Sequence, residues 1–184
     1  DDMVDPQYLT WTITDASDFQ KVEEILDEKE TEDQPLFLFN VTMQNHSPYN
    51  TDFDNLPETI RITSDHVEDK DQAERYLNLI HLSDEAAKNL VGYFKGIDDP
   101  TIIVMFGDHE PGLSGAFYES ILPKKRSQMS DKEEMDLYHT PFFIWANYDI
   151  PEEEDVKISA NYLQTKVKEI AGLDLTGYDK FLKQ

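Results

Sequence analysis

One apolar stretch constrains the fold of this chain more than any other. Residues 101–106, with the sequence TIIVMF, carry no charge and are rich in β-branched side chains. This composition is typical of a strand that is covered on both faces, as parallel strands of α/β proteins are. The stretch ends in Gly107, Asp108 and His109, and ligands of open α/β sheets bind beyond the carboxyl ends of the strands. The sequence therefore predicts a buried strand that leads into a polar site.

Asp108 and His109 supply a carboxylate and an imidazole, which are both common metal ligands. Neighbouring side chains of a regular strand point to opposite faces, so these two can converge on one ion only where the chain leaves strand geometry. Gly107 allows such a turn. An ordinary strand-end turn is the alternative, in which Asp108 caps backbone amides and His109 faces water. The tripeptide alone leaves both interpretations open.

Two other stretches are predicted to be strands. Residues 36–43 (LFLFNVTM) form a second apolar run, and the chain then continues through polar residues to His46. A histidine at this place is either functional or an ordinary turn residue. Residues 138–147 are the third predicted strand, and Pro141 puts the start of its hydrogen-bonded ladder after the proline.

Helices are predicted between these strands. Residues 18–29 have apolar positions at helical spacing, with Asp15 or Ser17 as the cap. Residues 71–94 form the longest helical pattern, and Asp84 interrupts its apolar stripe. Asp84 is either a buried residue that needs hydrogen-bond partners or the start of a second helix.

The C-terminal part is predicted to hold one more helix. Residues 156–171 fit a helix that ends at Gly172, a C-cap residue. The tail 173–184 has several apolar residues and is expected to pack back on the body. Residues 1–16 are expected to be extended, 30–34 to form a loop, and 114–136 to mix loop and helix.

The order of these elements predicts an α/β sheet. A right-handed crossover through residues 71–97 would make the strands 36–43 and 101–106 parallel. The 184 residues fit one domain with a hydrophobic core, residues 1–184.

Composition excludes several classes of function. The chain has 39 acidic and 16 basic residues and a formal net charge of −23, which argues against nucleic acid as the main partner. The acidic clusters at 23–33 and 152–155 are interpreted as solvated surface, because neither has the spacing of an EF-hand calcium loop. The absence of cysteine excludes disulfides and thiolate metal sites. No apolar run has the roughly 20 residues that a membrane helix needs. Since residue 1 is not Met, we expect a piece of a longer protein.

Three blocks taken together resemble a known family. Residues 39–49 (FNVTMQNHSPY), 104–109 (VMFGDH) and 140–148 (TPFFIWANY) resemble, in this order, the C-terminal half of a sulfatase-like domain. The pattern most resembles the lipoteichoic acid synthase and phosphoglycerol transferase family of the alkaline phosphatase superfamily. The resemblance extends from about residue 36 to 182. It implies an alkaline phosphatase/sulfatase-like sheet flanked by helices, of which this chain holds the C-terminal portion.

The resemblance also implies a site. Such enzymes hold a divalent cation, often Mn²⁺, between a Glu, a nucleophilic Thr and an Asp-His pair, which corresponds here to Asp108 and His109. Mg²⁺, Zn²⁺ and Ca²⁺ stay open. The family's substrate-contacting catalytic histidine corresponds to His46. The Glu and the nucleophilic Thr belong to an N-terminal half that has no counterpart in this chain, so half a site is expected.

The remaining candidates are weaker. Trp11, Thr14 and Asp15 lie upstream of the first predicted strand, where relatives often carry substrate-contacting residues. The other histidines match no family motif and are interpreted as surface or packing residues. They are His66, His81 and His139.

The implied function belongs to a longer parent protein. We expect a membrane-anchored enzyme at the outer face of the cell membrane, which transfers or hydrolyses phosphoglycerol groups of a glycerophosphate lipid or polymer. A sulfuric ester hydrolase and a non-catalytic binding module that keeps the fold are the alternatives. For the 184 residues alone we expect weak metal affinity and no turnover.

Overall fold

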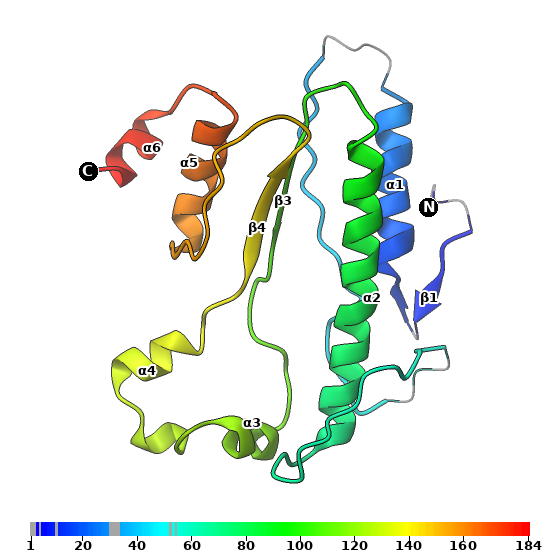
Figure 1. The fold of residues 1–184 in the computed structure, drawn as a ribbon, viewed down its shortest axis with the longest axis vertical. Helices are drawn as coiled ribbons and strands as arrows, with labels where there is room; N and C mark the ends of the chain where they lie inside the picture. Colours follow the sequence, from blue (N-terminus) through cyan, green and yellow to red (C-terminus); the bar gives the residue numbers. More distant parts are fainter. Residues whose placement is uncertain (1–2, 4, 10, 30–33, 52, 54) are drawn as a thin grey trace. The chain divides into compact units, whose positions relative to one another are not determined.

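The structure is a computed structural model that describes residues 3, 5–9, 11–29, 34–51, 53 and 55–184 (Figure 1). The chain forms two compact units. The first comprises Asp1–Tyr93 and Asp108–Thr140, and the second comprises Phe94–Gly107 and Pro141–Gln184. The loop expected at 30–34 lies, except for its last residue, outside the described residues. The assignment of 1–184 to one domain stays a prediction.

The first unit begins with a short hairpin followed by a helix. Strands β1 (Tyr8–Leu9) and β2 (Thr12–Ile13) pair antiparallel, which confirms the extended start of the chain. Helix α1 (Asp15–Asp27) follows at once. Neither Asp15 nor Ser17 is its N-cap, as the sequence had suggested. Thr14 has an extended backbone and its side chain accepts a hydrogen bond from the Ser17 amide, so Thr14 satisfies the open amide of the first turn.

Helix α2 (Lys70–Phe94) is continuous, which confirms the long predicted helix. A restart at Asp84 is wrong, and so is its burial, because the Asp84 side chain is exposed. The buried face agrees with the predicted apolar stripe in part. Ala73, Ala87 and Phe94 of the stripe are buried, whereas Ile80 of the stripe is 38% exposed and Leu79, outside the stripe, is 0% exposed. The difference has a physical cause, because the residues that cover this face of α2 come from segments distant in the sequence.

The core of the first unit lies between α2, the hairpin and two loops. Leu9, Tyr49 and Leu79 are buried against one another. The Tyr49 and Tyr76 rings meet edge to face with centroids 5.4 Å apart. Partly buried apolar residues complete the cluster: Phe53, Leu56, Tyr76, Leu82 and Leu113. This core joins the loop after residue 43 to the loop after residue 107.

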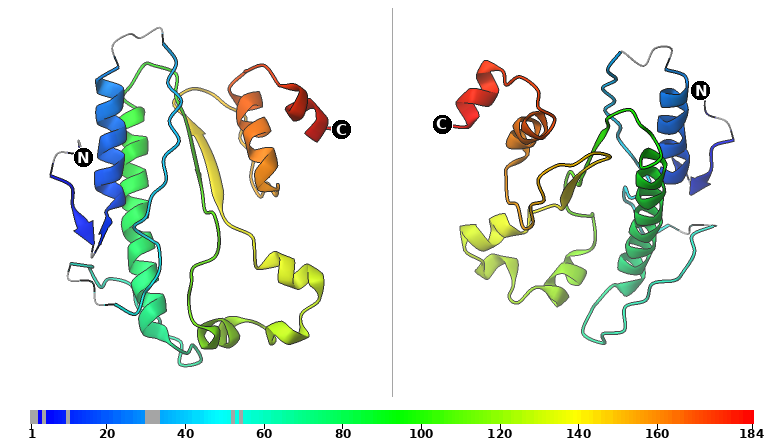
Figure 2. Two further views of the ribbon diagram at one scale, coloured as in Figure 1. Left: turned by 180° about the vertical axis from the view of Figure 1, so that it is seen from behind. Right: turned by 45° about the horizontal axis from the view of Figure 1, so that its top comes forward.

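The predicted buried strand at 36–43 is wrong. The segment is extended but pairs with no other strand among the described residues, and it runs as a plain trace in Figure 2. Phe37 is 89% exposed and Phe39 is 69% exposed. The predicted parallel pairing with residues 101–106 is therefore absent as well. A strand is stable only where neighbours satisfy its backbone groups, and the described chain supplies none here.

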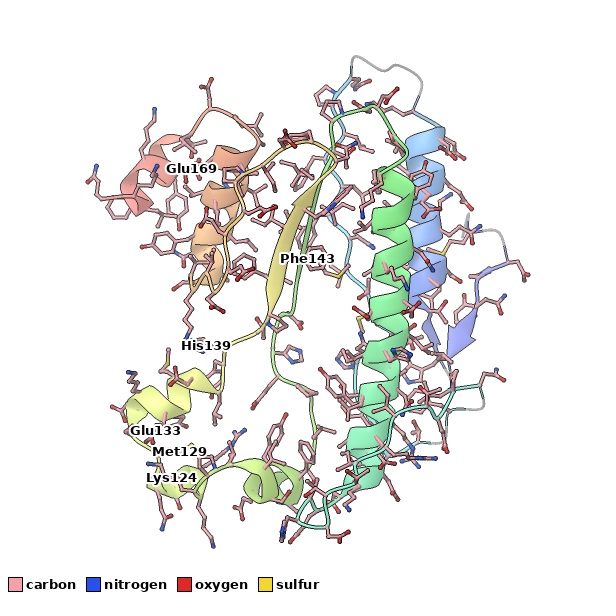
Figure 3. The ribbon with its side chains drawn as sticks, viewed as in Figure 1. Lys124, Met129, Glu133, His139, Phe143 and Glu169 are labelled. Atoms are coloured by element: carbon pink, nitrogen blue, oxygen red, sulfur yellow. The ribbon has the colours of Figure 1, made fainter. Side chains whose placement is uncertain are left out.

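The rest of the first unit mixes loop and helix, as predicted for 114–136. It contains α3 (Gly115–Ile121), the 3₁₀ helix η1 (Arg126–Gln128) and α4 (Asp131–Asp136). Figure 3 shows Lys124 and Glu133 close together, and their Nζ and Oε2 atoms form an ion pair at 2.7 Å.

The second unit is built on a two-stranded ladder. Strand β3 (Ile102–Phe106) pairs antiparallel with β4 (Phe142–Ala146), with Val104 opposite Ile144. Both strands and the start of the ladder after Pro141 were predicted. The expectation that β3 is buried on both faces is wrong, because four of its five residues are half-buried and Phe106 is exposed.

Two helices complete the second unit. Helix α5 (Ala160–Ile170) has Ala171 as its C-cap, one residue before the predicted Gly172. Gly172 follows at φ +66°, and the Leu173 amide donates to the Lys168 carbonyl, which closes the helix end. Residues 156–159 precede the helix. Helix α6 (Gly177–Leu182) packs on α5, as expected for the tail.

The contacts that hold α6 are polar and not apolar as expected. Phe181 is 67% exposed. Asp179 is fully buried and accepts hydrogen bonds from Thr165 Oγ1 at 2.9 Å and Lys168 Nζ at 2.7 Å. Among the described residues, no helix is long and apolar enough to cross a membrane.

Candidate functional site

Asp108 and His109 converge directly after β3. The Gly107 amide donates to the Pro141 carbonyl at 3.1 Å, and the chain then leaves the ladder. His109 Nε2 lies 3.3 Å from Asp108 Oδ2. The His109 amide also donates to Asp108 Oδ1 at 2.9 Å, so the capping bond of an ordinary turn exists as well. The structure therefore shows the ordinary turn, with Asp108 as the cap and His109 exposed, and the metal site stays a prediction.

Each ring nitrogen of His109 lies near an acceptor oxygen. Its Nδ1 is 2.8 Å from the Glu110 carbonyl oxygen, and its Nε2 is 3.3 Å from Asp108 Oδ2. With the hydrogen on Nδ1, the lone pair of Nε2 would be available to a cation beside the Asp108 carboxylate. Backbone carbonyls commonly orient metal-binding imidazoles in this way.

This donor set fits a divalent cation. Two donor atoms 3.3 Å apart can both reach one ion at the usual distance of about 2.1 Å. The two side chains are 80% (Asp108) and 65% (His109) exposed, so an ion can reach them. Within the described part of the chain, no group of three or more His, Asp or Glu side chains could hold a metal. Asp108 and His109 would thus be part of a ligand set.

His46 also places its Nδ1 beside a backbone carbonyl. Its Nδ1 lies 2.7 Å from the Ser47 carbonyl oxygen, so Nδ1 donates and Nε2 is the proton acceptor of the neutral ring. The side chain is exposed. The ring of Trp11 meets it edge to face, with centroids 6.4 Å apart and an interplanar angle of 75°. His46 therefore lies at the surface, with a free Nε2 and an aromatic neighbour.

A buried polar network holds the residues directly before His46. Gln44 is 2% exposed; its Oε1 accepts from the Asp15 amide at 3.0 Å, and its Nε2 donates to the Leu79 carbonyl at 3.0 Å. Ser83 Oγ accepts from Gln44 at 2.9 Å and from Asn45 at 2.7 Å. The network attaches the His46 loop to α2.

Ser83 completes this network through its own proton. Its hydroxyl donates to Asp15 Oδ2 at 2.6 Å, so one donor and two acceptors are all used. Asp15 is 3% exposed, and burial, the largest effect, raises the pKa of its carboxyl. Asp15 Oδ1 has no hydrogen-bond partner.

The three upstream candidates have different positions. Asp15 is buried in the network and Thr14 caps α1, so neither presents its side chain to a ligand. This corrects the suggestion that they contact substrate. Trp11 is 60% exposed and touches His46.

The loop of His46 packs against the loop of Asp108 and His109. A Cβ atom on Gly112 would lie 3.2 Å from Ser47 Oγ, closer than most side-chain contacts, so the Ser47 side chain lies against the Gly112 backbone where glycine has no side chain. Leu113 enters the same core as Tyr49. The second loop is also braced by the ion pair between Arg126 and Glu110 at 2.9 Å.

Other polar features lie outside this site. His66, His81 and His139 are exposed, as expected, and Figure 3 labels His139 after α4, 3.7 Å from Asp136. A shallow hollow of about 280 Å³ at the start of α2 contains no candidate residue. Its lining mixes both signs of charge: Asn50, Asp69, Lys70, Asp71, Gln72 and Arg75.

Sequence reasoning missed the residues that support the site. No role was predicted for Gln44, which lies inside the block 39–49, nor for Ser83 or Gly112. The weak signal was the polar pair Gln44-Asn45 directly after an apolar run.

Comparisons with known proteins identify the family and the fold. The family model described as Sulfatase matches residues 1–173. The chain is 30% identical over 171 residues to a Rhizobium meliloti (strain 1021) protein named "Putative cyclic beta-1,2-glucan modification protein". The match covers 91% of this chain and 27% of that protein.

A solved structure shares the fold. Streptococcus pyogenes phosphoglycerol transferase GacH, in complex with sn-glycerol-1-phosphate, matches with a TM-score of 0.76 and 21% identity. The match covers all of this chain and 44% of that chain, so this chain spans less than half of the length of either relative. It has the alkaline phosphatase/sulfatase-like fold over that part. The chain belongs to the sulfatase family.

Proposed function

We propose that this chain is the part of a metal-dependent phosphoglycerol transferase that carries the Asp108–His109 ligand pair and His46. The observation that carries the proposal is the 3.3 Å approach of His109 Nε2 to Asp108 Oδ2, with the other ring nitrogen beside the Glu110 carbonyl. GacH, which shares the fold, is a phosphoglycerol transferase and its structure contains sn-glycerol-1-phosphate. The proposed substrate is a glycerophosphate lipid or polymer of the cell envelope.

The pair Asp108–His109 would hold a divalent cation. Mn²⁺ is proposed, and Mg²⁺, Zn²⁺ and Ca²⁺ are compatible with an oxygen and nitrogen donor set. When bound, such an ion neutralises phosphoryl charge and acts as a Lewis acid. A further carboxylate ligand and the nucleophilic hydroxyl would come from a part of the parent protein outside these 184 residues.

His46 would move the proton of the transfer. The oxygen of the acceptor hydroxyl forms a bond to phosphorus. The bond between phosphorus and the oxygen of the nucleophilic side chain, which carries the phosphoglycerol group, breaks, and the proton of the acceptor hydroxyl passes to His46 Nε2. The neutral ring with hydrogen on Nδ1 has the acceptor that this step needs. The buried network at Gln44 and Ser83 limits the movement of the loop that carries the ring.

The name of the Rhizobium meliloti relative suggests one acceptor. A cyclic β-1,2-glucan modification is consistent with transfer of phosphoglycerol to a glucan hydroxyl. We propose such a neutral glucan as the acceptor, in a membrane-anchored parent at the outer face of the cell membrane. Water in place of the sugar hydroxyl would give hydrolysis with the same residues.

The proposal is tested on the extracytoplasmic part of the full parent protein. Release of phosphoglycerol from a phosphatidylglycerol-like substrate is measured with Mn²⁺ or with a chelator, for the wild type and for Asp108→Ala, His109→Ala and His46→Ala. His81→Ala is the matched control, because His81 is an exposed histidine on α2. We expect turnover that needs Mn²⁺ and falls at least about 100-fold in the first three variants only. Turnover that is unchanged in those variants would overturn the assignment.

A sulfuric ester hydrolase is the second candidate, since the matching family model is Sulfatase. Matched sulfate and phosphodiester substrates with the same leaving group distinguish the two. Faster turnover of the sulfate would favour this candidate. A well-folded parent with no activity on either substrate would favour a non-catalytic binding module.

A further inference from the structure

We infer that Trp11 is a sugar-binding platform beside His46, on which the apolar face of a neutral acceptor sugar lies. The inference rests on the proposed function, since it names the residue that binds the acceptor of that reaction. It assigns to Trp11 a role in specificity, through direct contact with the substrate.

The first observation is the exposure of Trp11. An indole is among the largest apolar side chains, yet Trp11 is 60% exposed between β1 and β2. Its ring contacts His46 edge to face, which accounts for only part of the ring surface. Most of the indole is therefore open to solvent directly beside the proposed proton acceptor.

The second observation is that the backbone segments carrying the two rings, Trp11 and His46, are held by buried residues and hydrogen bonds. The residues on either side of the Trp11 turn, Leu9 and Thr12, are 5% exposed each, and Thr12 Oγ1 donates to the Leu9 carbonyl at 3.1 Å. His46 follows Gln44 and Asn45, whose side chains hydrogen-bond to Ser83. Two rings held from separate anchors meet at the surface, which is the preorganised arrangement that a binding site needs.

The chemistry of Trp11 favours a neutral sugar. One face of a pyranose carries mainly C–H groups, and it can cover an indole face while its hydroxyls stay hydrated or reach a polar neighbour. His46 is that neighbour, because its Nε2 can accept a hydroxyl proton. The chain has a net charge of −23, so an anionic acceptor would be repelled at long range, whereas a neutral ring would not.

A hydroxyl of the sugar on Trp11 gives its proton to His46 Nε2, and the oxygen of this hydroxyl forms the new bond to phosphorus. The bond between phosphorus and the oxygen of the nucleophilic side chain breaks. Trp11 takes no part in bond making. Its loss should therefore weaken the use of a sugar acceptor more than transfer to water.

The binding test uses the tryptophan fluorescence of the 184-residue chain. The sequence has only two tryptophans, and Trp145 lies half-buried on β4, so Trp145→Phe leaves Trp11 as the reporter. Titration with neutral cyclic β-1,2-glucan should give a saturable change of emission in Trp145→Phe. Trp11→Ala should lose glucan binding at least tenfold by calorimetry, and Trp11→Phe less. Tyr8→Ala is the control, because Tyr8 is an aromatic of similar exposure (54%) on the same hairpin.

The kinetic test uses the parent protein. Trp11→Ala should raise KM for the glucan acceptor at least tenfold and lower the ratio of transfer to glucan over hydrolysis, whereas Tyr8→Ala should change neither. His46→Ala should lose both reactions. An unchanged acceptor KM in Trp11→Ala, together with no fluorescence change in Trp145→Phe, would overturn the platform while metal-dependent hydrolysis would still support the proposed function. A glucan-dependent fluorescence change in a parent without turnover would support the platform and contradict the proposed function.

The charge of the ligand gives a further distinction. Neutral glucan should bind more tightly than a sulfated glucan at low salt, and the difference should shrink at high salt. Aromatic faces also bind cations, and the acidic surface would favour them. Tighter binding of choline than of glucan to Trp145→Phe would overturn the sugar assignment.

Discussion

At the scale of single residues, one hydroxyl organises the support of the candidate site. Ser83 bonds to three side chains from two segments, Asp15 at the start of α1 and Gln44 and Asn45 directly before His46. Buried polar groups are expensive when they lose a partner, which makes this hydroxyl more important than its size suggests.

Ser83→Ala should destabilise the chain. The substitution leaves buried partners unsatisfied, so we expect a loss of about 1–3 kcal/mol in the free energy of unfolding. Urea unfolding followed by circular dichroism measures it. Ser127→Ala is the control, because Ser127 is exposed. Equal stability of the two variants would contradict the role given to the network.

Asp15→Asn should show a pH-dependent effect. Burial raises the pKa of the Asp15 carboxyl in the folded state, so its contribution to stability is full below the unfolded pKa of about 4 and is lost as the pH rises through the folded pKa. Asparagine does not ionise. The stability of Asp15→Asn relative to wild type should therefore increase between pH 4 and pH 7.

Unfolding in urea at both pH values tests this, with Asp84→Asn, an exposed position on α2, as the control. The same difference between variant and wild type at pH 4 and pH 7 would show that Asp15 is not the titrating group.

At the scale of elements, α6 is held by one buried carboxylate. The Lys168 ammonium, followed by the Thr176 hydroxyl, holds the pKa of Asp179 far below its usual range. A lowered pKa stabilises the fold above the unfolded pKa, and this contribution is lost as the pH falls through the folded pKa.

Asp179→Asn should therefore lower Tm at pH 7, because the charged partner of Lys168 is removed. The difference from wild type should become smaller as the pH falls below about 4. Differential scanning calorimetry at several pH values measures it. Asp174→Asn, an exposed position in the same tail, should leave Tm unchanged at every pH.

At the scale of the whole molecule, the exposed apolar segment 36–43 is where we expect the environment of this chain to differ from that in a longer parent. Phe37 is 89% exposed, and this chain covers 44% of GacH. We expect the remaining part of a longer parent to supply strands that cover the segment.

Phe37→Ser tests that expectation. In the 184-residue chain it should change the free energy of unfolding by less than about 0.5 kcal/mol, as surface substitutions do. In the parent it should cost about 3 kcal/mol, because the ring would then be in a core. Leu79→Ala, at a position that is 0% exposed, should destabilise both proteins. A small effect of Phe37→Ser in the parent would show that the segment stays open.

The affinity for Mn²⁺ should be lower in the 184-residue chain than in the parent. The 184-residue chain presents the pair Asp108–His109, so we expect weak Mn²⁺ binding in calorimetry and tight binding in the parent. His109→Ala should abolish the weak binding. Tight binding by the isolated chain, lost in His109→Ala, would mean that the ligand set is complete within it.

The local elements and the family could be predicted from the sequence, because both depend on short stretches of the chain. The existence of α2, β3 and β4 follows from local periodicity and from short apolar runs with turn residues at their ends. The family followed from three short blocks in order, and the family model confirms it. The roles of His46, Asp108 and His109 stay predictions, although the convergence of Asp108 with His109 agrees with them.

The tertiary structure decided everything that depends on residues distant in the sequence. It determined which face of α2 is buried, because Leu9 and Tyr49 cover Leu79 and not Ile80. It left 36–43 without a ladder, because a strand needs a neighbour and an apolar composition cannot provide one. The contact of Trp11 with His46 has the same origin, since it forms only where the hairpin and the loop meet. The sequence by itself determined the local elements and the family, while the fold determined their partners.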